Sequence, residues 1–297
     1  MQVHELTTER RHRATGNLDR MSSLELVTAM NREDALVPRA IRRVLPEIAR
    51  AVDLVAQRLA RGGRLIYVGS GTSGRIGALD ASECSPTFGV SQKMVQFVIA
   101  GGERALVMAT EASEDSAEMG RKDMAARRPG KRDVVVGLAA SGYTPYTISA
   151  LEYARAKGAA TVAVAFNRGS ALGKVADISI ETEVGPEVLA GSSRLKAGTA
   201  EKLICNMLTT GAMTRLGYVY SNLMVNLHLT NKKLMQRGMT ILQELTGVDS
   251  RQASDTLRKA GRSVPLALVM LKTGTSKAES ARRLRRTRGN VRKAIEG

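Results

Sequence analysis

Glycine and hydroxyl residues follow a short apolar run in the first quarter of the chain. The run Leu65–Val68 has the β-branched and aromatic residues of a buried strand, and Gly69, Thr72 and Ser73 come directly after it. Glycines let the backbone turn tightly and approach a ligand. The free N–H groups at the start of a following helix attract anions. Residues 69–75, which we call the first cradle, therefore predict a phosphate-binding turn between a strand and a helix.

The same letters also fit the GxGxxG pattern of dinucleotide-binding proteins. That pattern requires a compact strand–helix–strand unit and an acidic residue about 20 positions further on. Here the next apolar strand, Met94–Ile99, comes late, and the acid at its end is Glu103. The spacing favours a phosphate site over a dinucleotide site.

A second hydroxyl-rich turn follows another apolar run. Asp133–Ala140 leads into Ser141 and Thr144, with Pro145 suited to a first helical turn. The hydroxyls of this second cradle (residues 141–145) could bind an anion or cap the helix, since both roles use the same helix start. Parallel strands bring their carboxyl ends to one edge of a sheet, so we expect the two cradles to lie on the same edge.

Alternating apolar runs and amphipathic stretches predict an α/β fold with a parallel sheet covered on both faces. The expected strands are 65–68, 94–99, 133–140, 161–166 and 178–181. The expected helices are 21–31, 37–61, 76–81, 105–125, 146–157, one that ends near 216, and 232–245. Short helices at 252–262, 265–272, 277–286 and 290–295 would form a small appendage. Pro86 is expected to end the helix that follows the first cradle.

Composition narrows the class of protein. The 297 residues are 43% hydrophobic, which indicates a globular chain with a sizeable core. Met1–Arg20 is polar, and no apolar run approaches the length of a membrane span, so we expect a cytoplasmic protein with no membrane association. The two cysteines and three histidines are scattered, which suggests neither a disulfide framework nor a metal site.

The formal net charge of +17 raises the question of nucleic-acid binding. From Arg251 onward, thirteen Lys and Arg residues against three Asp and Glu residues give a charge of +10. No aromatic residue is present there to stack on bases. The tail is therefore interpreted as a solvated basic helical surface without a specific nucleic-acid partner.

A dense polar block, Gly185–Lys202, precedes the long helix that ends near residue 216. By residue type alone it is either a capped connection or a ligand site. Together with the first cradle and its continuation 77–87, and with the acidic segment 111–116, this block resembles the N-acetylmuramic acid 6-phosphate etherases. The resemblance extends across nearly the whole chain, and the 185–202 signature is shared with the glucokinase regulatory proteins.

The resemblance implies a three-layer αβα sugar isomerase domain with a five-stranded parallel sheet. It also implies an organisation into N-terminal helices that pack on the core (1–60), a phosphosugar-binding domain (61–245) and a small basic helical domain (246–297). The implied reaction removes the D-lactyl ether of N-acetylmuramic acid 6-phosphate by elimination and hydration, without a cofactor or metal. The expected partner is a second copy in a homodimer. The alternative is a non-catalytic phosphosugar sensor that regulates a partner protein.

The family pattern also assigns roles to residues. It implies that Glu83 is the catalytic acid, in a semi-apolar setting, and that Glu114 is a second catalytic carboxylate, with Glu111 and Asp115 as its competitors. Without the pattern, either glutamate would be interpreted as a surface charge. The implied phosphate contacts are Thr72, Ser73, Ser141 and Thr144. Ser70 is a weaker candidate, and further possible substrate contacts are Gly71, Glu187, Arg194 and Lys196.

Overall fold

The computed structural model describes residues 6–108, 113–227, 229 and 231–297. The chain divides into two compact units. The first unit consists of Met1–Ser82 and Lys93–Thr209, and the second of Glu83–Gln92 and Thr210–Gly297. The expected domain boundaries near residues 60 and 245 stay predictions.

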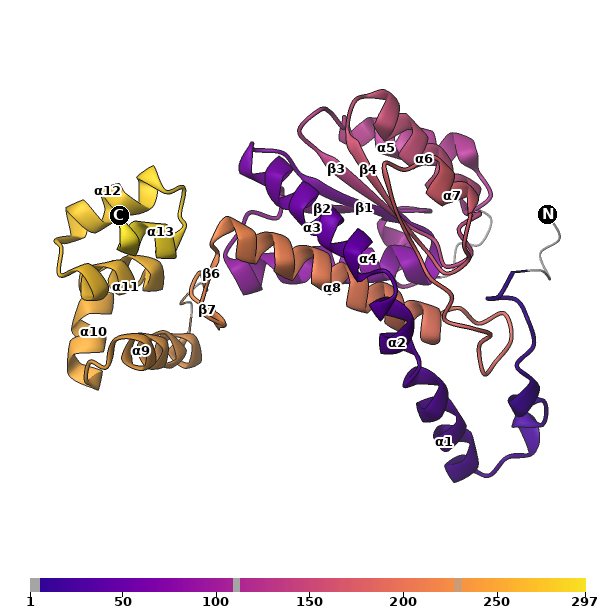
Figure 1. Ribbon diagram of the computed structural model, residues 1–297. Coiled ribbons are helices and arrows are strands. Elements are labelled where there is room, and N and C mark those ends of the chain that lie inside the picture. Colours follow the sequence, from indigo (N-terminus) through magenta and orange to yellow (C-terminus); the bar gives the residue numbers. More distant parts are fainter. Residues whose placement is uncertain (1–5, 109–112, 228, 230) are drawn as a thin grey trace. The chain divides into compact units, whose positions relative to one another are not determined.

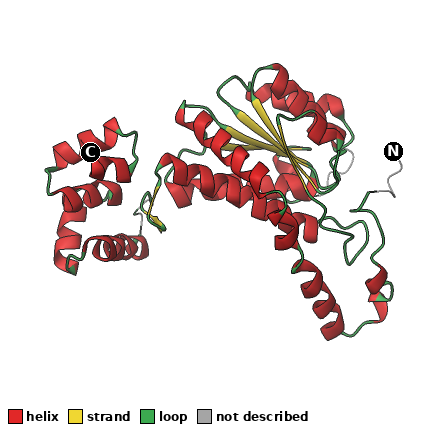
Figure 2. Ribbon diagram, viewed as in Figure 1, coloured by secondary structure: helices red, strands yellow, loops and turns green. Residues whose placement is uncertain are grey.

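The first unit is built on a five-stranded parallel sheet, drawn in yellow in Figure 2, with the strand order β2-β1-β3-β4-β5. The strands are β1 (Leu65–Gly69), β2 (Val95–Ile99), β3 (Val134–Leu138), β4 (Ala160–Ala165) and β5 (Ile178–Glu181). They lie within a few residues of the expected runs. The predicted α/β class with a five-stranded parallel sheet is confirmed.

Helices cover both faces of this sheet (Figure 1). On one face, Ile66 and Val68 of β1 belong to a buried cluster with Met124, Leu151 and Leu172. These three residues lie on α5 (Ala117–Arg127), α6 (Pro145–Ala156) and α7 (Ala171–Lys174). The alternate side chain Tyr67 points to the other face, where α3 (Leu45–Ala60), α4 (Gly71–Phe88) and α8 (Lys196–Leu216) lie. The period of two along β1 therefore fixes the three-layer arrangement.

The expected helix 37–61 is two helices, α2 (Val37–Arg42) and α3, which follow α1 (Ser23–Asp34). Val44 leaves the helical conformation, with φ −118°, and Pro46 occupies the first turn of α3. Proline has no N–H to donate to the preceding turn, and its ring clashes with the carbonyl four residues earlier. The spacing of apolar residues is continuous across this break. Periodicity alone therefore predicted one helix, and the structure has two.

The expected helix 105–125 is wrong in its first half. Glu103–Leu106 forms a short 3-10 helix, and α5 begins only at Ala117. Ser116 caps α5, because its side chain accepts a hydrogen bond from the backbone N–H of Met119. Part of the expected helix, including Glu111, lies outside the described residues.

The helix after the first cradle is longer than expected. α4 begins at Gly71 and continues through Pro86 to Phe88 instead of spanning 76–81. Pro86 lies in the last turn, so it removes a hydrogen bond only where the helix is about to end. The consequence is that Glu83 sits on the same continuous helix as the first cradle.

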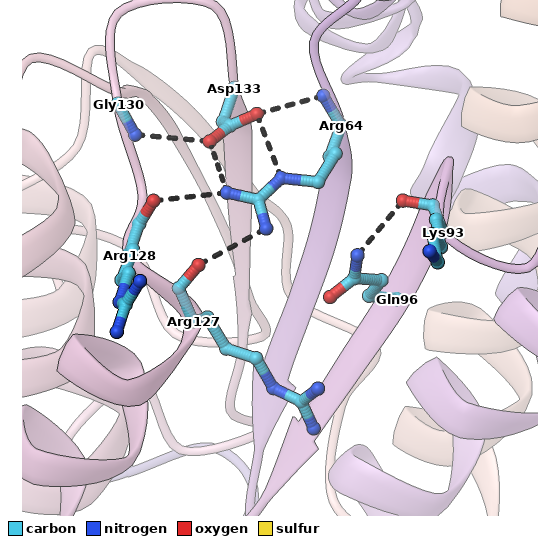
Figure 3. A network of polar contacts seen from close by, with 7 residues as sticks. All are labelled: Arg64, Lys93, Gln96, Arg127, Arg128, Gly130 and Asp133. Atoms are coloured by element: carbon cyan, nitrogen blue, oxygen red, sulfur yellow. Dashed lines mark hydrogen bonds and ion pairs between the residues drawn. The ribbon is translucent and has the colours of Figure 1, made fainter.

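An ion pair joins the amino ends of β1 and β3, at the edge of the sheet opposite to the cradles (Figure 3). The Arg64 guanidinium lies 2.7 Å from Asp133 Oδ2 and also donates to the carbonyls of Arg127 and Arg128. Burial by itself raises the pKa of Asp133, but the hydrogen bonds from Arg64 and Gly130 outweigh it and leave the pKa lowered. This network fixes the loop between α5 and β3.

The second unit is mainly helical. Its helices are α9 (Lys232–Thr246), α10 (Ser250–Lys259), α11 (Val264–Thr273), α12 (Lys277–Arg286) and α13 (Val291–Glu296), and a two-stranded antiparallel pair, β6 (Val219–Tyr220) and β7 (Leu223–Met224), precedes them. Ile241, Leu257, Leu268 and Val291 belong to its buried core. The predicted C-terminal helices are confirmed. Among the described residues, no helix combines the length and the apolar character needed to cross a membrane.

Candidate active site

The two cradles lie at the carboxyl ends of neighbouring strands. β1 and β3 pair in parallel, with Gly69 opposite Leu138, so the first and second cradles leave the sheet side by side. A Cβ atom on Gly69 would lie 2.9 Å from both the Leu138 carbonyl oxygen and the Gly74 nitrogen. Only glycine fits there, which explains why the strand ends in this residue.

The hydroxyls of the first cradle differ in their surroundings. Ser73 is buried, and its Oγ donates to Glu201 Oε1 over 2.6 Å. Thr72 is half-buried, and its methyl group lies beside Gly198 of α8. The buried Ser70 Oγ has no hydrogen-bond partner within the described chain. Gly71 is exposed and has a φ of +51°.

The second cradle retains an unused hydroxyl at the start of α6. Thr144 precedes that helix, but its side chain makes no capping hydrogen bond. Ser141 Oγ accepts from the Tyr143 N–H, and the Ser141 carbonyl accepts from Asn167 Nδ2. Helix capping therefore does not account for Thr144, and the hydroxyl stays a candidate anion contact.

Asn167, which the sequence did not single out, connects the N-terminal segment to the second cradle. Its Oδ1 accepts from the Thr7 N–H and Oγ1, while its Nδ2 donates to Ser141 and contacts Thr8. The two threonines and Asn167 are some 160 positions apart in the chain. No local spacing could have indicated this contact.

Glu187 and Lys196, two of the possible substrate contacts, are buried in polar contacts of their own. Glu187 is 0% exposed, and its two carboxylate oxygens accept from the backbone N–H groups of Lys196 and Ala197 at the start of α8. Burial raises the pKa of Glu187 despite these hydrogen bonds. Lys196 is 1% exposed, and its Nζ lies 2.6 Å from Glu33, which also contacts His12. Arg194, in contrast, is exposed.

The two expected catalytic carboxylates belong to different units. Glu83 is an exposed residue of α4 and not in the semi-apolar setting that was expected. Glu114 is also exposed, and its carbonyl accepts from the Tyr146 N–H in the first turn of α6. The backbone of Glu114 is therefore fixed beside the second cradle. Its competitor Asp115 is exposed.

Glu201 is the buried carboxyl group that sequence reasoning missed. It is 1% exposed, and burial raises its pKa to about 8 even though the hydrogen bond from Ser73 favours the charged form. Glu201 lies near the end of the polar block 185–202, and its hydrogen bond with Ser73, 128 positions earlier, links it to the first cradle.

Three family models match the chain, and the first two of them overlap at residues 103–155. The N-terminal SIS domain of glucokinase regulatory protein matches residues 47–155, and the SIS domain matches residues 103–211. The C-terminal lid domain of glucokinase regulatory protein matches residues 221–261. The two SIS-domain matches therefore include the residues that form the sheet and both cradles.

Curated relatives match over the whole length. The N-acetylmuramic acid 6-phosphate etherase of Clostridium beijerinckii is 48% identical over 296 residues, which is 100% of this chain and 97% of that protein. The etherase of Symbiobacterium thermophilum is 54% identical over 92% of this chain and 91% of its own length. This chain belongs to the N-acetylmuramic acid 6-phosphate etherase family. The resemblance drawn from the sequence motifs is confirmed.

Solved structures agree with the etherase-family fold. A phosphoheptose isomerase from Francisella tularensis covers 65% of this chain and 100% of its own, with a TM-score of 0.53 and 20% identity. At this identity the likeness concerns the fold alone.

Proposed function

We propose that this protein cleaves the D-lactyl ether of N-acetylmuramic acid 6-phosphate, giving N-acetylglucosamine 6-phosphate and D-lactate. The observation that carries the proposal is full-length similarity to etherases, at 48% identity over 100% of the chain in one case. The paired cradles at neighbouring strand ends support it, since they supply backbone N–H groups and hydroxyls for a sugar phosphate.

The chemistry requires a held phosphate and carboxyl groups near C2 and C3 of the sugar. We assign the phosphate to Thr72, Ser73, Ser141 and Thr144. With the ring open, the C2 hydrogen lies next to an aldehyde, so a carboxylate can remove it while the C3 oxygen departs as lactate. Water then adds to the unsaturated aldehyde. Glu114 is proposed as the base and Glu83 as the acid that protonates the departing oxygen.

Glu187 and Lys196 receive a supporting role in this proposal. Their carboxylate and ammonium groups are already engaged with the α8 backbone and with Glu33. We propose that they hold the start of α8, where Gly198 lies against Thr72 of the first cradle. The exposed Arg194 stays a proposed substrate contact.

A second copy of the chain is proposed to complete each site. Ser73 and Glu83 are ten residues apart on α4, which is about 15 Å along a helix. That is longer than the span from the phosphate to C3 of one hexose phosphate, so we propose that Glu83 acts on a sugar held by the cradle of a second copy. α1 has no buried residue, and its Leu24 and Val27 are 75% and 53% exposed, as expected for a helix that packs on a partner.

The direct test is release of D-lactate from N-acetylmuramic acid 6-phosphate by the purified protein. We expect turnover without added nucleotide, and solvent deuterium at C2 of the product, because that proton is removed and later returned. Folded protein that releases no D-lactate from authentic substrate would contradict the etherase activity. Product without deuterium would contradict elimination.

A phosphosugar-responsive regulator is the second candidate, favoured by the matches to glucokinase regulatory protein models at residues 47–155 and 221–261. Such a protein would bind the phosphosugar through the same cradles without consuming it. Binding of substrate with no lactate release would support this role. The cytoplasmic location stays a prediction.

A further inference from the structure

The hydrogen bond between Ser73 and Glu201 joins the first cradle to a buried carboxyl group. Ser73 is the third residue of α4, and Glu201 lies in the second turn of α8. Their oxygen atoms are 2.6 Å apart, and both side chains are buried, at 8% and 1% exposure. An acidic side chain is thus hydrogen-bonded to a hydroxyl that the proposed function assigns to the phosphate.

The protonation state of Glu201 decides what Ser73 offers to that site. A hydroxyl has one proton to donate. If Glu201 is a carboxylate, the Ser73 proton is held inward by it, and Ser73 presents only lone pairs to an incoming phosphate. If Glu201 is a neutral acid, its own proton can be donated to Ser73 Oγ. Ser73 keeps its proton, and the hydroxyl can then donate it in a hydrogen bond to an anion in the cradle.

We propose that Glu201 is a positioning residue for the substrate phosphate, and that binding of a phosphate dianion requires the neutral form of its carboxyl group. The inference rests on the proposed function, in which Ser73 contacts the phosphate. In proton terms, a chain with ionised Glu201 takes up one proton from solvent when the dianion binds. No other bond forms or breaks.

The surroundings of Glu201 favour the neutral form. Burial raises its pKa to about 8. One turn further along α8, burial and then the negative charges of Asp80 and Glu201 raise the pKa of the Cys205 thiol. Lys202, the cation next to Glu201 in sequence, is exposed. The interface between α4 and α8 thus resists a further negative charge, and a phosphate dianion beside Ser73 adds to this effect.

Asp80 supplies a matched control on the same helix pair. It is a buried carboxyl group of α4, and it accepts from Tyr67 of β1 and from Asn206 and Thr209 of α8. Burial raises its pKa as well. The hydrogen bonds to Tyr67, Asn206 and Thr209 are separate from the one between Ser73 and Glu201, so replacing Asp80 changes the charge of the interface while Glu201 keeps its bond to Ser73.

The test is calorimetric titration of the full chain with N-acetylglucosamine 6-phosphate at about pH 8, in buffers of different ionisation enthalpy. The phosphate is a dianion there, with its second pKa near 6, so any proton taken up goes to the protein. We expect uptake of about half a proton by the wild type, since a group with a pKa near 8 is half ionised. Above about pH 8 the Kd should rise about tenfold per pH unit.

Glu201→Gln should abolish both the proton uptake and the rise in Kd, and Asp80→Asn should keep both. No uptake by the wild type, equal uptake by Glu201→Gln, or loss of uptake in Asp80→Asn would each overturn the inference. The wild-type result stands even if a variant fails to fold. Because the titration does not use turnover, a chain that releases no D-lactate but takes up the proton would refute only the proposed function.

Discussion

At the scale of single residues, Glu83 is the proposed acid that protonates the departing lactyl oxygen. It is an exposed side chain of α4, and Gln keeps its size but cannot transfer a proton. We expect Glu83→Gln to lower kcat for D-lactate release by about 10²- to 10⁴-fold, the usual contribution of a general acid. The measurement is a steady-state assay with Glu152→Gln, an exposed change on α6, as the control. If the Glu83→Gln protein released D-lactate at the wild-type rate, Glu83 would not be the catalytic acid.

Single residues also show where sequence reasoning reaches its limit. Thr72, Ser73, Ser141 and Thr144 were predicted as phosphate contacts from the family pattern and from their positions just after a strand. The fold brings such positions together at one sheet edge. Glu201 was missed because its contact with Ser73 spans 128 positions. Burial, which raises the pKa of that carboxyl group, and the long-range hydrogen bond to Ser73 have no local signature in the sequence.

At the scale of elements, the close approach of α5 to α6 holds Glu114 beside the second cradle. A Cβ atom on Gly120 of α5 would lie 2.1 Å from the Tyr146 carbonyl oxygen, and the Tyr146 N–H bonds Glu114. We expect Gly120→Ala to push the helices apart, to lower the free energy of unfolding by about 1–3 kcal/mol and to reduce kcat.

Denaturant unfolding and the lactate assay check this prediction. Gly130→Ala is the matched control, because a Cβ atom there meets nothing within 4 Å. Its stability should change by less than about 0.5 kcal/mol. A Gly120→Ala protein as stable and as active as the control would show that the α5–α6 contact does not position Glu114.

Elements were predictable where one local signal dominated. The first four strands were found because each is a largely apolar run ended by glycine or polar residues, and the fifth, Ile178–Glu181, alternates apolar and polar residues. The expected helices failed at their ends: Pro46 divided a continuous apolar stripe, Ser116 started α5 late, and Pro86 was tolerated in the last turn of α4. Each of these outcomes depends on a single residue at a helix end. Hydrophobic periodicity is read over many residues, so it does not detect such an end.

At the scale of the whole molecule, the length of α4 leads us to predict that each site is built from two chains. In the proposed homodimer, the cradle of one chain faces the partner subunit's Glu83. Each dimer then contains two equivalent sites, as two-fold symmetry requires. A sedimentation measurement on the wild type should give twice the mass of the chain.

Mixed dimers separate this arrangement from one in which each chain supplies its own site. Ser73→Ala and Glu83→Gln chains should each form nearly inactive homodimers. A mixed dimer of the two, isolated with different affinity tags, contains one site with both residues intact and one site with both replaced. We expect it to recover about half of the wild-type rate of D-lactate release. If Glu83 instead acts within its own chain, every site in the mixed dimer carries one defect, and its rate would only equal the mean of the two inactive parents.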